Sequence, residues 1–185
     1  MSDYISSNLT ESEKDSWATP QWLFDALDQE FDFALDAAAN STNFKVPNFY
    51  TQEDDALSID NWSKNLLLIA KPAVWINPPY SRGMVKAFID KAREQCTKHK
   101  LTIVLLVPAT PDASWWPTDA SEVRFITHGR ISFEHPTENK TVNGNTKGSA
   151  IVIFRHVDIG SPMVTRYVSR AKLMLQAQQK NKAAA

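Results

Sequence analysis

The segment LTIVLLVP, residues 101–108, limits the possible folds more than any other part of the sequence. Its apolar residues follow one another without alternation, and a proline ends the run. A strand of this kind has both faces covered, which is the usual condition of strands at the centre of an α/β sheet. The rest of the chain therefore has to supply helices for both faces.

Other segments have the patterns that such a sheet needs. Strand patterns occur at 31–36, 66–70, 73–77, 122–127 and 149–156, and helical spacing of apolar residues occurs at 18–30, 82–98 and 163–179. In the first helix we expect Thr19 to be the N-cap and Pro20 to be the first helical residue. Strands that alternate with helices predict an α/β domain with a mostly parallel central sheet and flanking helices.

The length of 185 residues and the hydrophobic content of 43% fit a single domain. We expect a flexible N-terminal arm at 1–16, the domain at 17–175 and a loose tail at 176–185. No apolar run approaches the roughly 18 residues of a membrane span, and the first residues lack the layout of a signal peptide. We therefore expect a cytoplasmic protein without membrane contact, whose single cysteine, Cys96, is a buried and inert thiol.

The net charge of −1 hides an uneven distribution of charged residues. Residues 1–62 include two basic and thirteen acidic residues, whereas residues 63–185 include eighteen basic and eight acidic ones. This asymmetry favours one region that binds a cationic small molecule and another that binds a polyanion. The alternative, a solvated surface without a ligand, stays open.

The tetrad Asn77-Pro78-Pro79-Tyr80 follows directly after a predicted strand. Two consecutive prolines fix φ and remove two N–H donors, so the turn is rigid and rich in acceptors. The Asn77 side-chain oxygen and the Pro78 carbonyl could hold both hydrogens of one amino group, and Tyr80 offers a ring for stacking. This set suits methylation of an exocyclic amine such as N6 of adenine, because its lone pair must be drawn out of the ring before it can attack. An ordinary turn at a strand end is the alternative.

Seven segments in chain order resemble the phage and prophage type of Dam-like DNA adenine-N6 methyltransferase. They are WATPQWLFDALDQEF, LDAAA, EDDALSIDNW, VWINPPYS, LLVPA, GRISF and NGNTKGS. The ordered set extends over about residues 16–155 and is much more specific than NPPY alone, which also occurs in enzymes that methylate protein glutamine or RNA. The resemblance implies a Rossmann-like methyltransferase fold with a catalytic domain at 17–175. It also implies methyl transfer from S-adenosylmethionine to a flipped-out adenine in double-stranded DNA.

The resemblance also assigns roles to residues. Asn77, Pro78, Pro79 and Tyr80 match the catalytic motif, and the positions that match the donor site are Asp36, Ala37, Ala38, Asp54, Asp55, Thr19, Pro20 and Trp22. Asp54 is the alternative to Asp55 for contact with the adenosine part of the donor. The chain departs from the usual pattern because alanines, not a Gly-rich turn, follow Asp36. For the aspartates, caps of turns and helices are the alternative, and for Trp22 it is a place in the core.

The polar region 127–149 is the candidate for contact with DNA. Its basic and amide side chains suit phosphates and base edges; those we select are Arg130, Lys140, Asn143, Asn145 and Lys147. A simple β-hairpin is the alternative. The four histidines lack the spacing of metal ligands, so we expect no metal. For Trp115 and Trp116 we expect packing and not function.

Two other functions stay open. An amino-methyltransferase that acts on RNA or protein glutamine would use the same donor. A non-catalytic relic that only binds the donor or DNA would need no acceptor. The resemblance implies GATC as a recognition site, but the site cannot be derived from the residues themselves. The sequence does not determine the oligomeric state either.

Overall fold

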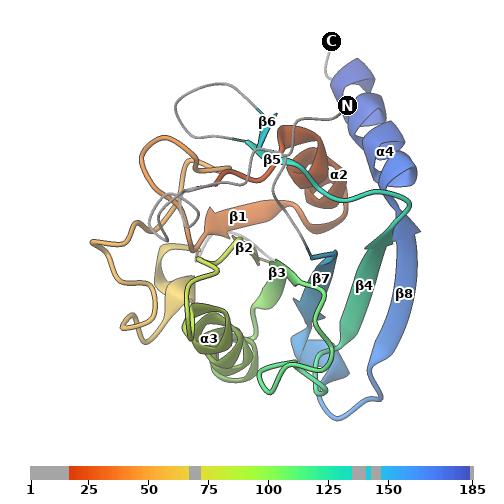
Figure 1. Cartoon of the computed structure of the whole chain (residues 1–185). Helices are drawn as coiled ribbons and strands as arrows, with labels where there is room; N and C mark the ends of the chain where they lie inside the picture. Colours follow the sequence, from red (N-terminus) through yellow and green to blue (C-terminus); the bar gives the residue numbers. More distant parts are fainter. Residues whose placement is uncertain (1–16, 67–71, 135–140, 143–146, 184–185) are drawn as a thin grey trace.

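The computed structural model describes residues 17–66, 72–134, 141–142 and 147–183. Its centre is a six-stranded sheet in the order β1-β2-β3-β7-β4-β8 (Figure 1). The strands are β1 (Phe33–Asp36), β2 (Ala73–Ile76), β3 (Thr102–Pro108), β4 (Glu122–Thr127), β7 (Ser149–Phe154) and β8 (Val164–Ser169). The helices are α2 (Gln21–Phe31), α3 (Met84–His99) and α4 (Arg170–Ala183), with two 3-10 turns, η1 (Trp62–Leu66) and η2 (His156–Asp158).

The sheet is mixed, and the prediction of a mostly parallel sheet was wrong. β1, β2 and β3 pair in parallel, as do β4 and β8, but β7 is antiparallel to both β3 and β4. All six residues of β7 are buried. A fully apolar run has the same appearance in sequence whatever the direction of its neighbours, so the pattern of 149–156 could not reveal the antiparallel pairing.

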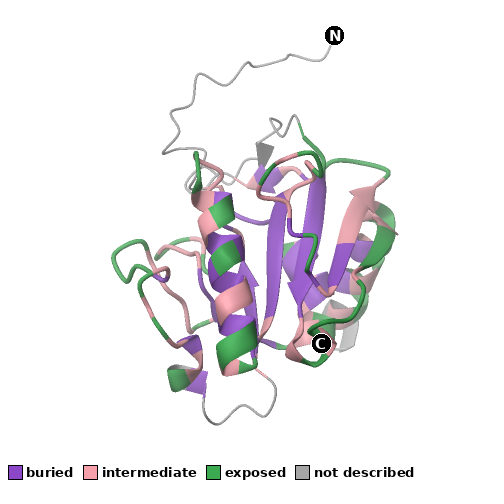
Figure 2. Cartoon of the chain, turned by 90° about the horizontal axis from the view of Figure 1, so that it is seen from below, coloured by how far each residue is buried: buried purple, intermediate pink, exposed green. Residues whose placement is uncertain are grey.

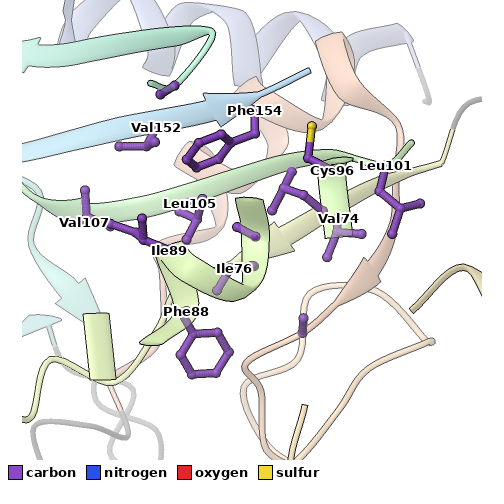
Figure 3. Close-up of a cluster of buried hydrophobic side chains, with 14 of the residues drawn as sticks. Val74, Ile76, Phe88, Ile89, Cys96, Leu101, Leu105, Val107, Val152 and Phe154 are labelled. Carbon is purple, nitrogen blue, oxygen red and sulfur yellow. The ribbon is translucent and has the colours of Figure 1, made fainter. Parts of the chain in front are cut away.

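Helices cover both faces of this sheet. On one face, α3 packs its residues Phe88 and Ile89 against Val74, Ile76 and Leu105 (Figure 3). On the other face, α2 and α4 form a second cluster with the strands. Burial is concentrated in the central strands and on the inner sides of the helices, whereas the edge strand β8 is mostly exposed (Figure 2). The prediction that the run at 101–108 is a strand covered on both faces is thus confirmed.

The C-terminal part differs from its prediction. Residues 163–179 were expected to form one helix, but the segment begins with strand β8, and only then does α4 begin at Arg170. Val164, Arg166 and Val168 are every second residue of β8 and so lie on one face of the strand. β8 pairs with β4 over its whole length. The backbone of α4 continues to Ala183, so most of the segment expected as a loose tail is helical.

Local predictions can be checked at several positions. Pro20, not Thr19, is the N-cap of α2, and no side chain caps this helix. Cys96 is buried, as predicted, and burial raises the pKa of its thiol to about 11. Trp115 and Trp116 pack against the α3-side core as expected. The arm at 1–16 and the predicted strand at 66–70, apart from Leu66 in η1, lie outside the described residues.

A hairpin forms in the region considered for DNA contact. β5 (Phe133–Glu134) pairs antiparallel with β6 (Thr141–Val142). Ala18 joins this small sheet through two backbone hydrogen bonds with Glu134. Among the described residues, no helix is long and apolar enough for a membrane span.

Gln95 of α3 anchors the segment that leads into η1. This side chain is fully buried; its amide donates to the Asp60 carbonyl at 2.7 Å and accepts from the Trp62 backbone N–H at 2.9 Å. The Trp62 indole in turn donates to the Ala56 carbonyl at 2.9 Å. A single buried amide thus fixes the backbone beside the core under α3.

We predict that Gln95→Met lowers the free energy of unfolding by about 1–3 kcal/mol, because methionine fills the space but leaves the buried Trp62 N–H without an acceptor. Urea titration measures this difference. The matched control on the same helix is Lys98→Met, which removes an exposed ion pair with Glu94 and should cost less than about 1 kcal/mol. Equal stability of the two variants would contradict the anchoring role.

Candidate active site

The tetrad lies at the carboxyl end of β2, between β1 and β3. β2 ends at Ile76, which pairs with Leu105, and Asn77 is the next residue. The two prolines then turn the chain out of the sheet toward Gly83, the N-cap of α3, whose φ is +86°. Asn77 and Tyr80 are thereby held at the edge where the parallel strands end, the usual place for ligands in such sheets.

The Asn77 amide has a defined orientation. Its Nδ2 donates to the Trp17 carbonyl at 3.3 Å. Because a carbonyl can only accept, the nitrogen must face Trp17 and Oδ1 must face the other way. Among the described residues, Asn77 Oδ1 is buried and has no hydrogen-bond partner. The site therefore presents an unused acceptor.

Tyr80 is fixed at both ends. Its hydroxyl donates to the Leu106 carbonyl at 3.3 Å, and its ring makes an edge contact with Phe133 at 6.0 Å between centroids. Burial raises the pKa of this hydroxyl far above its usual value, so the group stays protonated. The residue offers a rigid ring and not an ionisable group.

A cavity of about 530 Å³ opens beside the carboxyl end of β1. Three residues of the expected donor site line it, namely Ala37, Ala38 and Asp55, and so does Pro79 of the tetrad. Its other walls come from Ala39, Asn40, Asn43, Thr51, Gln52, Ala56, Leu57, Ser81, Met84 and Phe88. The cavity thus adjoins the tetrad and has small side chains where β1 ends.

Asp36 organises the base of this region and does not line the cavity. Its side chain is 2% exposed and accepts backbone hydrogen bonds from Ala38 at 3.3 Å and from Lys45 at 3.1 Å. Burial raises its pKa to about 6, against the opposing effects of these two N–H groups and the Lys45 charge. In this structure the carboxyl group therefore holds the loop that follows β1.

The two neighbouring aspartates have different environments. Asp54 is exposed and accepts from the backbone N–H and the hydroxyl of Thr51, both at 2.7 Å, and these bonds lower its pKa. Asp55 lines the cavity, has a φ of +47° and accepts a hydrogen bond from the Ser58 hydroxyl. Only Asp55 of this pair is positioned to meet a ligand in the cavity.

The N-terminal residues expected at the donor site lie outside the cavity. Thr19, Pro20 and Trp22 do not line the cavity. Thr19 is 2% exposed, and within the described residues its hydroxyl has no partner. Trp22 packs against the core, and the Arg170 guanidinium lies over its ring at 5.7 Å.

Some residues of the site were not singled out from the sequence. Met84 and Phe88 line the cavity, although their helical spacing suggested only a core position. Trp17 holds the Asn77 amide through its backbone carbonyl. Trp17 and Asn77 are 60 positions apart in the sequence, and a hydrogen bond made by a backbone atom leaves no signal in the residue pattern.

Comparison with known proteins supplies the family. The family model described as DNA N-6-adenine-methyltransferase (Dam) matches residues 6–180. The chain belongs to this family. It is 32% identical over 179 residues to a DNA N-6-adenine-methyltransferase of Haemophilus phage HP1, a match that covers 92% of this chain and 98% of that protein. It is also 32% identical over 183 residues to the enzyme of the same name from Escherichia phage T1, covering 89% and 73%.

Two of the residues selected for DNA contact in this Dam-family chain are exposed basic residues. Arg130 and Lys147 are exposed, whereas Lys140, Asn143 and Asn145 lie outside the described residues. Arg130 follows Gly129, whose φ is +135°; a Cβ there would lie 3.1 Å from the Arg170 Cδ atom. Within the described ranges, no group of three or more His, Cys, Asp or Glu side chains is arranged to hold a metal ion.

The raised pKa of Asp36 predicts a pH dependence of stability. The native protein keeps the proton up to about pH 6, whereas the unfolded chain releases it near pH 3.8. The unfolded state therefore binds fewer protons in this window, and the free energy of unfolding should fall as pH rises through it, by about 3 kcal/mol.

Urea titrations of the wild type and Asp36→Asn between pH 4 and pH 7 measure this effect. Because asparagine does not titrate, the fall should be absent from the variant. Parallel pH profiles for the two proteins would contradict the assignment.

Proposed function

We propose that the protein transfers a methyl group from S-adenosylmethionine to N6 of a flipped-out adenine in double-stranded DNA. The observation that supports this best is the Asn77 amide. Its nitrogen is held by Trp17, and its buried oxygen lacks a partner among the described residues. An unpaired buried acceptor costs about 1–3 kcal/mol, a cost that the amino group of a substrate would remove.

The tetrad can activate an amine without a strong base. Asn77 Oδ1 and the Pro78 carbonyl accept the two hydrogens of the amino group and draw its nitrogen toward tetrahedral geometry. The proton leaves only after the nitrogen has become cationic, so water can accept it. Tyr80 presents its ring to the base, which must leave the DNA stack to reach this site.

The cavity beside β1 fits the methyl donor. Ala37 and Ala38 leave room for a ligand close to the backbone, and the Asp55 carboxylate can accept hydrogen bonds from adenosine hydroxyls. Asp36 supports this wall through the loop. The assignment of Thr19, Pro20 and Trp22 to the donor site rests on the family resemblance, because these residues do not line the cavity. When bound, S-adenosylmethionine supplies a methyl group activated by its positively charged sulfur.

The family and the fold support the finer assignments. A central sheet with helices on both faces and a ligand site at the ends of β1 and β2 agrees with a Rossmann-like methyltransferase fold. Arg130 and Lys147 are exposed cations suited to DNA phosphates. The phage origin of the two relatives supports a phage or prophage protein.

The decisive experiment measures transfer of labelled methyl from S-adenosylmethionine to unmethylated DNA, followed by nucleoside analysis and mapping of the modified sites. We expect N6-methyladenine at one short sequence, and GATC is the first to be examined. Parallel reactions with RNA and with a glutamine-containing protein serve as acceptor controls. Donor binding without methylated DNA would refute the proposal. Labelled methyl groups in RNA or protein would show that RNA or protein, and not DNA, is the acceptor.

We predict that Asn77→Ala lowers the methylation rate at least about 100-fold, because the amine loses its acceptor. The dissociation constant of the donor should stay unchanged, because neither Asn77 nor Trp17, which also loses its hydrogen bond with Asn77, lines the cavity. Single-turnover rates and calorimetric titration with S-adenosylmethionine measure the two quantities. Asn61→Ala is the matched control, since the oxygen of that amide accepts from the backbone N–H and the hydroxyl of Ser63 in a turn that does not line the cavity. Near-normal turnover of Asn77→Ala would remove this mechanism.

The aspartate pair gives a second test. Asp55→Ala should weaken donor binding about tenfold, the usual effect of one lost hydrogen bond between a carboxylate and a ligand hydroxyl. Asp54→Ala should weaken it less, because the Asp54 carboxylate does not itself line the cavity and acts only through its hydrogen bonds with Thr51. Calorimetric titration compares the two variants, and the reverse order would assign the contact to Asp54.

A further inference from the structure

Buried polar atoms without partners gather around the tetrad. In the part of the chain that the structure describes, five such side-chain atoms occur, in Trp17, Thr19, Asn77, His156 and Arg170. Three of them belong to Asn77 and to the short segment that holds it. Unpaired buried polar groups are rare in native proteins, and each calls for an explanation. A ligand at this point would satisfy several of them together.

The indole of Trp17 is fixed beside the tetrad. The backbone that follows it is held, because Ala18 pairs with Glu134 and the Trp17 carbonyl accepts from Asn77 Nδ2. The indole ring stacks on Phe133 at 6.0 Å with an interplanar angle of 28°. Phe133 also makes the edge contact with Tyr80. Trp17 therefore shares one aromatic cluster with the ring that faces the base.

The chemistry of the indole determines what its partner must be. The Nε1–H group can only donate, so the partner missing from Trp17 has to be an acceptor. The Thr19 hydroxyl can donate or accept and makes no such demand. Asn77 Oδ1 can only accept, so its missing partner has to be a donor. One ligand that presents a donor next to an acceptor would satisfy Trp17 and Asn77 at once.

Adenine has this arrangement. Its amino group donates, and the ring nitrogens N1 and N7 on either side of that group both accept. We propose that Trp17 is a specificity-determining residue, whose indole N–H donates to N1 or N7 of the target adenine while Asn77 Oδ1 accepts from N6. This inference rests on the proposed function.

Guanine would be rejected by the same pair of groups. At the position of the adenine amine it has the O6 acceptor, which would face the Asn77 oxygen, and its N1 is a donor that would face the indole N–H if the indole reads that side. Two like groups brought together in a buried site are strongly unfavourable. Trp17 thus acts with Asn77 on the choice of base, in addition to its hold on the amide.

The test is the variant Trp17→Phe, which keeps a ring against Phe133 and removes the N–H. Its substrates are short duplexes with the mapped site that contain adenine, 1-deazaadenine or 7-deazaadenine at the target position. On adenine, kcat/KM should fall about tenfold, the effect of one hydrogen bond. On the analogue that lacks the acceptor read by Trp17, the variant and the wild type should be equal. On the other analogue the tenfold difference should remain.

Matched controls separate this role from a structural one. The variant should bind S-adenosylmethionine with unchanged affinity and unfold at the wild-type temperature or above it, since the removed N–H has no partner in the described structure. Trp116→Phe is the control substitution, because its indole stacks on Phe125 at 5.8 Å, away from the tetrad cluster. It should retain the wild-type preference among the three duplexes.

Three results would overturn the role of Trp17. They are unchanged kcat/KM on adenine, an equal loss on all three duplexes, or a tenfold loss of donor affinity, which would assign the indole to the methyl donor. If the wild type itself forms no N6-methyladenine, the proposed function fails and this inference fails with it. Normal methylation by the wild type combined with any of the three results rejects the inference alone.

Discussion

The parallel pairing of β1, β2 and β3 is the constraint on which the site depends. It brings the carboxyl ends of three strands to one edge, with Asp36 opposite Trp75 and Ile76 opposite Leu105. The alanine-lined cavity follows β1 and the tetrad follows β2, while β3 supplies the Leu106 carbonyl that holds Tyr80. The strands are buried on both faces, so hydrophobic burial fixes their register and with it the distance between the cavity and the tetrad.

The polar groups of the site divide into those that build it and those that remain available. Asp36 and Gln95 are almost wholly buried, and their side chains form hydrogen bonds with backbone groups that lie next to them in the fold. Asn77 and Trp17 each keep one buried atom unpaired among the described residues. Such atoms reduce stability, and binding of a ligand that pairs with them offsets this loss.

The contrast between Asp36 and Asp55 shows how far motif reasoning extends. Both residues stand where the family resemblance places donor-site carboxylates, but only Asp55 lines the cavity. Asp36 turns inward because the backbone N–H groups of Ala38 and Lys45, two and nine residues further along the chain, both donate to its oxygens. Residue type and order therefore locate the region of a site, whereas the direction of each side chain depends on which donors the fold brings near.

The sequence by itself determined the α/β class, the strands β1 to β3, the helices α2 and α3, and the tetrad at a strand end, because apolar periodicity and paired prolines act locally. Only the tertiary structure decided that β7 is antiparallel, that β8 precedes α4, and that Trp17 orients the Asn77 amide. These features join segments far apart in the chain. Their energies come from partners that no local pattern can specify.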